Sequence, residues 1–145
     1  MEVVNTLDID GTQWEIRDEE ARKKIADLEY QLSTQELQDI TIKMNENYNS
    51  SYAVMYNHYK VGKIHFMNVV LSNISGENIG TTSAAIIGLI NIKPKKVTGF
   101  LLHDYVNNVT FYCYLDENGF VVIADSMGLA QGNNACLGQL IFAEA

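Results

Sequence analysis

The spacing of hydrophobic positions changes twice along the chain and divides it into three segments. Over Glu2–Arg17, apolar and polar residues alternate on both sides of Asp10-Gly11, a strong two-residue turn signal. From Asp18 to Leu32 the apolar residues instead recur every three or four positions, which is the period of a helix. From Tyr52 onward the alternation returns. We therefore expect a β-hairpin over residues 1–17, a helix over residues 18–38 and a β domain, the head, over residues 39–145.

The predicted helix has the narrow apolar stripe of a coiled-coil seam rather than the wider face of a helix that lies on a globular core. Charged residues occupy the rest of its surface, and Asp18 is a good N-cap. A helix of this length is marginal alone in water, so the stripe needs a partner. We interpret the helix as an oligomerising stalk, and a helix packed on its own domain remains the alternative. The seam residues are Ala21, Ile25, Leu28 and Leu32.

The sequence pattern of the head predicts an all-β structure. Turn signals separate apolar runs at intervals of roughly 8–12 residues, and this spacing is typical of a sandwich or jelly roll. The predicted fold class is therefore mainly β: a hairpin and a short coiled-coil helix followed by an antiparallel, jelly-roll-like β-sandwich. The predicted strands are Ala53–Val61, Lys63–Ser72, Ser83–Ile92, Val97–Tyr105, Val109–Leu115, Phe120–Ala124 and Leu137–Phe142.

Two of these strands are apolar on both faces. In Lys63–Ser72, Phe66 and Val70 alternate with Met67 and Val69. A two-sheet sandwich normally exposes one face of each sheet to water, so a second apolar face needs another cover. We expect that cover to be another subunit. The alternative is that these strands lie centrally in a tightly curled sheet.

Composition excludes several function classes. The net charge of the 145 residues is −8, of which −7 falls in the first 46 residues. Because neither part has a basic stripe, nucleic-acid binding is not expected. No apolar run approaches the roughly 20 residues of a membrane-spanning helix, and no signal-peptide pattern is present, so we expect a cytosolic product without membrane insertion. Cys113 and Cys136 lie in apolar surroundings and are expected to be buried free thiols.

The stretch Leu7–Thr12, LDIDGT, matches the nucleophile motif of haloacid-dehalogenase-like phosphatases, in which the first Asp attacks phosphorus. That chemistry needs a parallel sheet and a later acidic pair that holds magnesium. Here Asp10-Gly11 is followed by what reads as a returning hairpin strand, so a phosphatase is disfavoured. His58, His65 and His103 have no metal-ligand spacing, so we expect no enzyme activity, cofactor or metal site.

The tyrosines are the strongest candidates for recognition, because tyrosine is amphipathic and loses little entropy on binding. Strand alternation places Tyr56 and His58 on one face, and Tyr112 and Tyr114 on one face. Cross-strand pairing or subunit contact is the alternative role. The candidate residues for a saccharide or another polar polymer are Tyr56, His58, Tyr105, Tyr112 and Tyr114.

Four stretches resemble tail-fibre and receptor-binding (baseplate) proteins of tailed bacteriophages. They are LDIDGTQWEIRDEEARKKIADLE (Leu7–Glu29), YKVGKIHFMNVVLSNIS (Tyr59–Ser75), YLDENGFVVI (Tyr114–Ile123) and LGQLIF (Leu137–Phe142).

This resemblance implies a virion protein of the phage tail, assembled in the bacterial cytoplasm as a parallel homotrimer. The N-terminal part would attach to other tail or baseplate proteins, and the head would bind a host-surface saccharide. A purely structural virion component is the alternative. The seam by itself does not separate a trimer from a dimer, because Ile25 with Leu28 is compatible with either.

Overall fold

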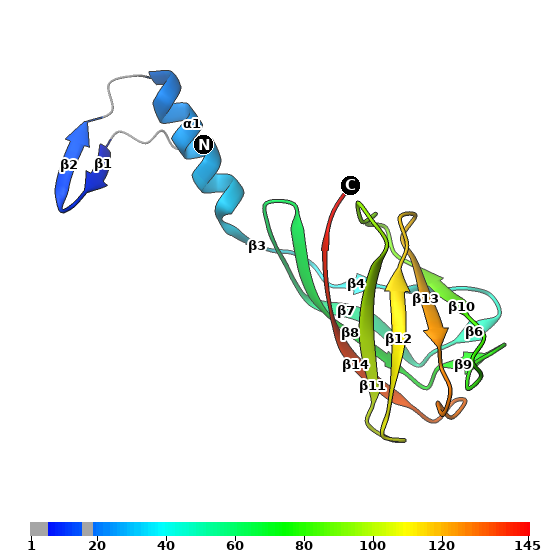
Figure 1. Cartoon of the computed structure of the whole chain (residues 1–145). Helices are drawn as coiled ribbons and strands as arrows, with labels where there is room; N and C mark the ends of the chain where they lie inside the picture. Colours follow the sequence, from blue (N-terminus) through cyan, green and yellow to red (C-terminus); the bar gives the residue numbers. More distant parts are fainter. Residues whose placement is uncertain (1–5, 16–18) are drawn as a thin grey trace.

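A computed structural model describes residues 6–15 and 19–145 of the chain. A hairpin of β1 (Thr6–Ile9) and β2 (Thr12–Glu15) precedes the helix α1 (Glu19–Leu32), which projects away from the β head (Figure 1). The strands of the head are β3 (Thr34–Glu36), β4 (Ile40–Thr41), β5 (Lys43–Met44), β6 (Tyr48–Asn49), β7 (Tyr52–Val61), β8 (Ile64–Ser72), β9 (Ser75–Gly76), β10 (Ala85–Leu89), β11 (Thr98–Asp104), β12 (Val109–Leu115), β13 (Phe120–Asp125) and β14 (Ala135–Ala143).

The N-terminal hairpin forms around the predicted turn. Strands β1 and β2 pair antiparallel, with Ile9 opposite Thr12. Asp10 and Gly11 both have positive φ angles, 51° and 77°. A two-residue turn whose twist matches the strands requires this left-handed pair, and Asp-Gly adopts it readily. The hairpin prediction is confirmed over the residues that the structure describes.

The helix is shorter than the sequence predicted. It ends at Leu32, and the Ser33 hydroxyl donates a hydrogen bond to the Tyr30 carbonyl at 2.7 Å. The next residues form β3, which pairs with β7, so the prediction of helix to residue 38 is wrong. The physical reason is that Thr34–Glu36 find ladder partners on β7. The predicted cap, Asp18, lies outside the described residues.

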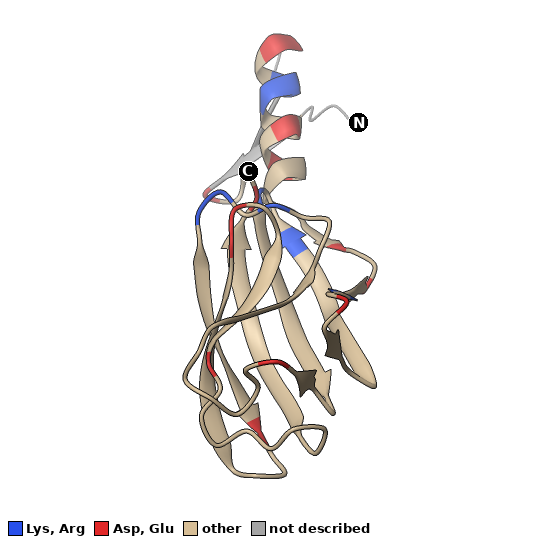
Figure 2. Ribbon diagram, turned by 90° about the vertical axis from the view of Figure 1, so that its right-hand side faces the viewer, with Lys and Arg blue, Asp and Glu red and all other residues tan. Residues whose placement is uncertain are grey.

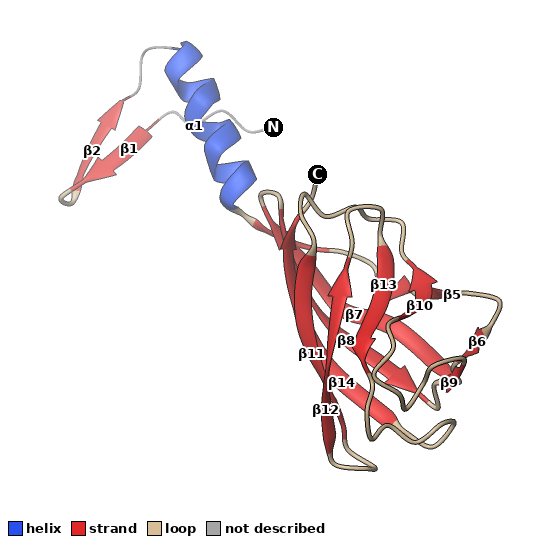
Figure 3. Ribbon diagram, turned by 45° about the vertical axis from the view of Figure 1, so that its right-hand side comes forward, coloured by secondary structure: helices blue, strands red, loops and turns tan. Residues whose placement is uncertain are grey.

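Ten of the twelve head strands form one continuous, fully antiparallel sheet, and β6 pairs with β9 in a separate two-stranded sheet. Nine of the ten follow the order β3-β7-β8-β14-β11-β12-β13-β10-β5, and β4 pairs separately with β7. The adjacent strands β4 and β5 therefore bond to opposite ends of the sheet, β4 to β7 and β5 to β10. Between them Ile42 is 2% exposed, and its N–H donates to the Ala53 carbonyl. The sheet consequently curls on itself into a sandwich-like, nearly closed body (Figure 3).

The mainly β prediction is confirmed, and the predicted strands match β7, β8 and β10–β14 closely. The core fills the inside of the curled sheet, where alternate residues of each strand meet. Both cysteines are buried there as free thiols. Fully buried core residues include Met55, Val69, Leu71, Ile87, Leu102, Leu115, Val121, Ile123 and Leu140.

The outer face of the sheet also carries apolar side chains. Ile64 on β8 is 44% exposed, and Leu101 on β11 is 58% exposed. The curled sheet matches the alternative that the sequence left open for strands with two apolar faces. The expectation that another subunit covers the outer face stays a prediction.

Asp104, at the end of β11, is a fully buried carboxylate that fixes the loop after it. It accepts hydrogen bonds from the backbone N–H groups of Val106 and Ala135, and from the Asn107 amide. Burial raises the pKa of Asp104, but these hydrogen bonds outweigh it, and the pKa lies below its ordinary value. The carboxylate therefore ties β11 to the start of β14.

We expect Asp104→Ala to lower the free energy of unfolding by about 3 kcal/mol, because it leaves buried N–H donors without an acceptor. The measurement is urea unfolding followed by tyrosine fluorescence. The control is Glu117→Ala in an exposed turn, which should change stability little. Equal effects of the two substitutions would contradict the assigned role of Asp104.

Candidate functional site

A β-bulge in β7 decides which side chains face the core and which face outward. Tyr56 pairs with Asn68 and Tyr59 pairs with Phe66, so β7 advances three residues where β8 advances two. Asn57 lies within this bulge and has a φ angle of 49°. After the bulge the alternation of β7 is reversed. His58 therefore turns inward and is 3% exposed, and the prediction that it shares a face with Tyr56 is wrong.

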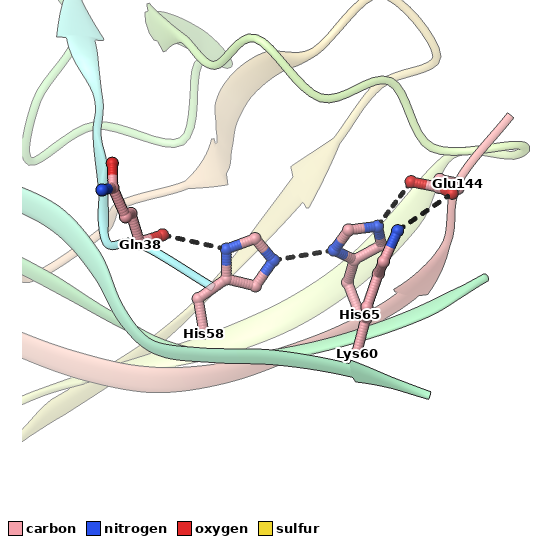
Figure 4. A network of polar contacts seen from close by, with 5 residues as sticks. All are labelled: Gln38, His58, Lys60, His65 and Glu144. Atoms are coloured by element: carbon pink, nitrogen blue, oxygen red, sulfur yellow. Dashed lines mark hydrogen bonds and ion pairs between the residues drawn. The ribbon is translucent and has the colours of Figure 1, made fainter. Parts of the chain in front are cut away.

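Inside the bulge, five residues form a continuous chain of four polar contacts (Figure 4). His58 Nδ1 lies 3.1 Å from the Gln38 carbonyl oxygen, and His58 Nε2 lies 2.7 Å from His65 Nδ1. His65 Nε2 lies 2.8 Å from Glu144 Oε2. Lys60 Nζ approaches the other carboxylate oxygen of Glu144 at 3.8 Å. The chain of contacts joins the segment after β3, the strands β7 and β8, and the C-terminal end of the chain.

The partners fix the protons of this network. The Gln38 carbonyl can only accept, so His58 Nδ1 donates to it. The pKa of His58 is lowered, chiefly because burial disfavours the charged ring. Neutral His58 therefore accepts at Nε2 from His65 Nδ1, and because the Glu144 carboxylate accepts from His65 Nε2, His65 donates from both ring nitrogens. The hydrogen bond from His65 is the main cause that lowers the pKa of Glu144, so this carboxylate is ionised.

This network ties separate parts of the head together. All four ring nitrogens are engaged, and the chain ends at a backbone carbonyl on one side and a lysine-paired carboxylate on the other. No hydroxyl or thiol takes part in these contacts. A hollow of about 520 Å³ lies beside His58, lined by Gln38, Asp39 and Lys43 among others.

Outside the bulge, seven residues form what we call the outer amide surface. Opposite each other lie Tyr56 and Asn68, Asn68 and Gln139, Tyr59 and Phe66, and Phe66 and Ile141. The surface therefore has one polar row and one apolar row, and Asn57 joins them on β7. The rings of Tyr59 and Phe66 stack with centroids 5.0 Å apart and planes 6° apart. A hollow of about 270 Å³ lies over them. The seven residues are Tyr56, Asn57, Tyr59, Phe66, Asn68, Gln139 and Ile141.

The predicted ligand-binding residues do not form one site. Tyr56 belongs to the outer amide surface, whereas His58 lies in the internal network. Tyr112 and Tyr114 face outward from β12, and the Tyr112 ring lies over Gly99. Tyr105 follows β11 and meets the His103 ring edge-on, with centroids 4.7 Å apart.

Sequence reasoning missed the amides beside Tyr56. The available signal was that Asn68 follows Phe66 by two positions, which places both on one strand face.

The predicted seam of α1 is exposed at its C-terminal half. Leu28 is 57% exposed and Leu32 is 72% exposed, whereas Ala21 and Ile25 are partly buried. The apolar stripe is therefore exposed in the half of the helix nearest the head. The partner that covers it stays a prediction.

The fold around Asp8 and Asp10 differs from the fold that the phosphatase chemistry uses. Asp8 lies in β1 and Asp10 in the turn of a two-stranded antiparallel hairpin, whereas that chemistry uses a parallel sheet. Within residues 6–15 and 19–145, no group of three His, Cys, Asp or Glu side chains is arranged to hold a metal ion. The described helix is too short and too charged to cross a bilayer.

Comparison with known proteins gives little. No protein-family model matches the chain, and no curated protein matches it. Among solved structures, it is similar to the receptor-binding protein gp15 of Listeria phage PSA. The alignment has 16% sequence identity and a TM-score of 0.46, and it covers 85% of this chain and 74% of the phage protein. A likeness of this size establishes neither family nor function.

The internal network predicts that acid destabilises the head. The folded-state pKa values of His58 and Glu144 both lie below their ordinary values. Protons therefore bind the unfolded chain more readily, and stability is lost as pH falls. We expect the loss to begin below about pH 6.5 through His58 and to continue below about pH 4.3 through Glu144. The measurement is urea unfolding at a series of pH values.

The matched variants replace one histidine each. His58→Phe should flatten the pH dependence between neutral pH and the carboxylate range, while it lowers stability at neutral pH. His103→Phe should keep the dependence, because His103 is only partly buried and bonds to Thr110. If both variants keep the wild-type slope, His58 is not the group responsible.

Proposed function

We propose that this chain is a self-associating tail protein of a tailed bacteriophage, whose head binds a saccharide on the host surface. The observation that carries the proposal is a charged helix with an exposed apolar stripe that projects from a β head. This arrangement separates an assembly element from a recognition element. The proposal coincides with the role named for the Listeria phage protein, but it rests on the geometry of this chain.

The helix supports self-association because its own interactions are too weak to keep it folded alone in water. It is 14 residues long, within the length range at which isolated helices are only marginally stable in water. Its pairs Glu19–Lys23 and Glu20–Lys24 are exposed and add little. Leu28 and Leu32 gain most from burial, and copies of the same stripe offer a matching surface. We assign the assembly as a parallel homotrimer.

The hairpin lies beyond the helix, on the side away from the head (Figure 1). An isolated two-stranded hairpin is marginally stable in water, so it needs a larger surface to pack against. This supports the assignment of the N-terminal part to attachment on other tail or baseplate proteins.

The charge of the head supports an uncharged ligand. Its basic residues gather at the end nearest the helix, while the strands beyond carry little charge (Figure 2). Backbone hydrogen bonds bring the chain around Lys63, Lys93 and Lys95 together beside the C-terminus. A neutral saccharide suits the remaining surface, and several weak sites on one stalk would gain avidity without new contacts.

We expect Ile25→Gln combined with Leu28→Gln to weaken assembly, because glutamine keeps helix propensity but removes the apolar seam. The helical signal in circular dichroism should then fall on dilution at higher protein concentrations than in the wild type. The matched control is Lys23→Gln combined with Asp27→Gln, two exposed positions away from the seam. Coincident dilution curves for both double variants and the wild type would refute the seam.

A further inference from the structure

We infer that the outer amide surface of β7, β8 and β14 is a binding site for a neutral hexopyranose unit. Tyr59 would supply the packing face, and Asn57, Asn68 and Gln139 would supply the hydrogen bonds. The inference rests on the proposed function for its ligand class, and of the residues that the sequence singled out it keeps only Tyr56.

The two rows of this surface match the two faces of a sugar. A pyranose has an apolar face of C–H groups and a rim of hydroxyl groups. The row of Tyr59, Phe66 and Ile141 is apolar, and the neighbouring row of Tyr56, Asn68 and Gln139 is polar. The hollow of about 270 Å³ is lined by members of both rows, though not by Tyr56, and has the size of a single small ligand unit rather than of a deep pocket.

The amides have free hydrogen-bonding capacity. Within the described residues, the side chains of Asn57, Asn68 and Gln139 make no hydrogen bond to the protein, whereas Asn45, Asn73, Asn107 and Asn134 all do. Each amide offers two donors and one acceptor oxygen. Sugar hydroxyl groups both donate and accept hydrogen bonds. Three neighbouring amides can therefore form hydrogen bonds with several hydroxyl groups at the rim of one sugar.

The aromatic pair is preorganised. Tyr59 is 39% exposed, and its stacking on Phe66 fixes the plane of its ring. Because the ring is already held, little side-chain entropy is lost when a ligand packs on it. Tyrosine also keeps its hydroxyl available at the edge of the site.

The bulge in β7 brings the third amide, that of Asn57, to the outer surface. In a regular strand, the residue that follows the outward-facing Tyr56 would face the core. Asn57 reaches the outer surface only because β7 has one residue more than β8 at this point. Its left-handed backbone is tolerated because asparagine adopts that conformation more readily than most residues. Bulges occur disproportionately next to functional sites, where they redirect a side chain.

A dry contact with another subunit fits these residues poorly. Burial of an amide without a partner costs about 1–3 kcal/mol for each unsatisfied group. An anionic ligand fits poorly as well, because Lys60 lies toward Glu144 and the nearest charged side chain, Glu36 opposite Tyr59, is acidic. An uncharged, hydroxyl-rich ligand remains the best match.

The test follows the side-chain NH₂ resonances of the full-length protein by NMR. The probes are methyl β-glucopyranoside, methyl β-galactopyranoside and N-acetylglucosamine, each added to about 50 mM, because one small site is expected to bind in the millimolar range. We expect at least one probe to shift the resonances of Asn57, Asn68 and Gln139 together. Asn68→Ala and Tyr59→Ala should each weaken that binding by about tenfold, which corresponds to about 1.4 kcal/mol.

The control variant is Tyr52→Ala, which removes an exposed tyrosine opposite Ser72 at the other end of β7 and should leave binding unchanged. No shift with any probe would overturn the site, as would shifts confined to residues around Tyr105 and Tyr112. Shifts that depend on protein concentration alone would show a subunit contact instead. Binding that persists in a monomeric chain would leave the site intact while the assembly part of the proposed function failed.

Discussion

The bulge at Asn57 is the constraint on which the rest of the head depends. One additional residue in β7 reverses the alternation of that strand midway, so that Met55 and His58 both face the core although they are three residues apart. The same reversal brings Tyr59 outward beside Phe66. The buried polar network and the outer amide surface are therefore two sides of one local irregularity, and neither could form on a regular strand.

The internal network also explains how the head holds its connection to the helix. The chain leaves α1, pairs briefly with β7 as β3, and then passes Gln38, whose carbonyl accepts the hydrogen bond of His58. It continues through Ile40–Met44, which bonds to both ends of the sheet. Glu144 meets His65 from the other end of the chain. The helix is thus joined to the head through a segment that also closes the sheet.

Much of this fold was predictable from local patterns. Asp10-Gly11 predicted the hairpin because few residue pairs tolerate two left-handed positions, and the three- and four-residue spacing predicted α1. Strand alternation found β7, β8 and β11–β14. The helix end was missed because Ser33 and Glu36 have the spacing of a helix capping box, and only pairing with β7, about 25 residues away, makes Thr34–Glu36 a strand. Propensity is a weak guide where a long-range ladder competes.

The site was less predictable than the fold. The His58 assignment failed because a bulge leaves no period-two signal, and the partner residues Asn68 and Gln139 lie about 70 positions apart and meet only through the pairing of β8 with β14. The single tyrosines were visible in the sequence, but their neighbours were not. Chemistry that depends on cross-strand registry needs the topology, which local spacing does not supply.

The most direct test of the account is the mass of the wild-type protein in solution, measured by light scattering during size-exclusion chromatography. The account predicts a particle near three times the chain mass of 16.3 kDa. A particle at the mass of one chain would contradict it, because the exposed stripe of α1 would then have no partner copy and the helix could not serve as an assembly stalk.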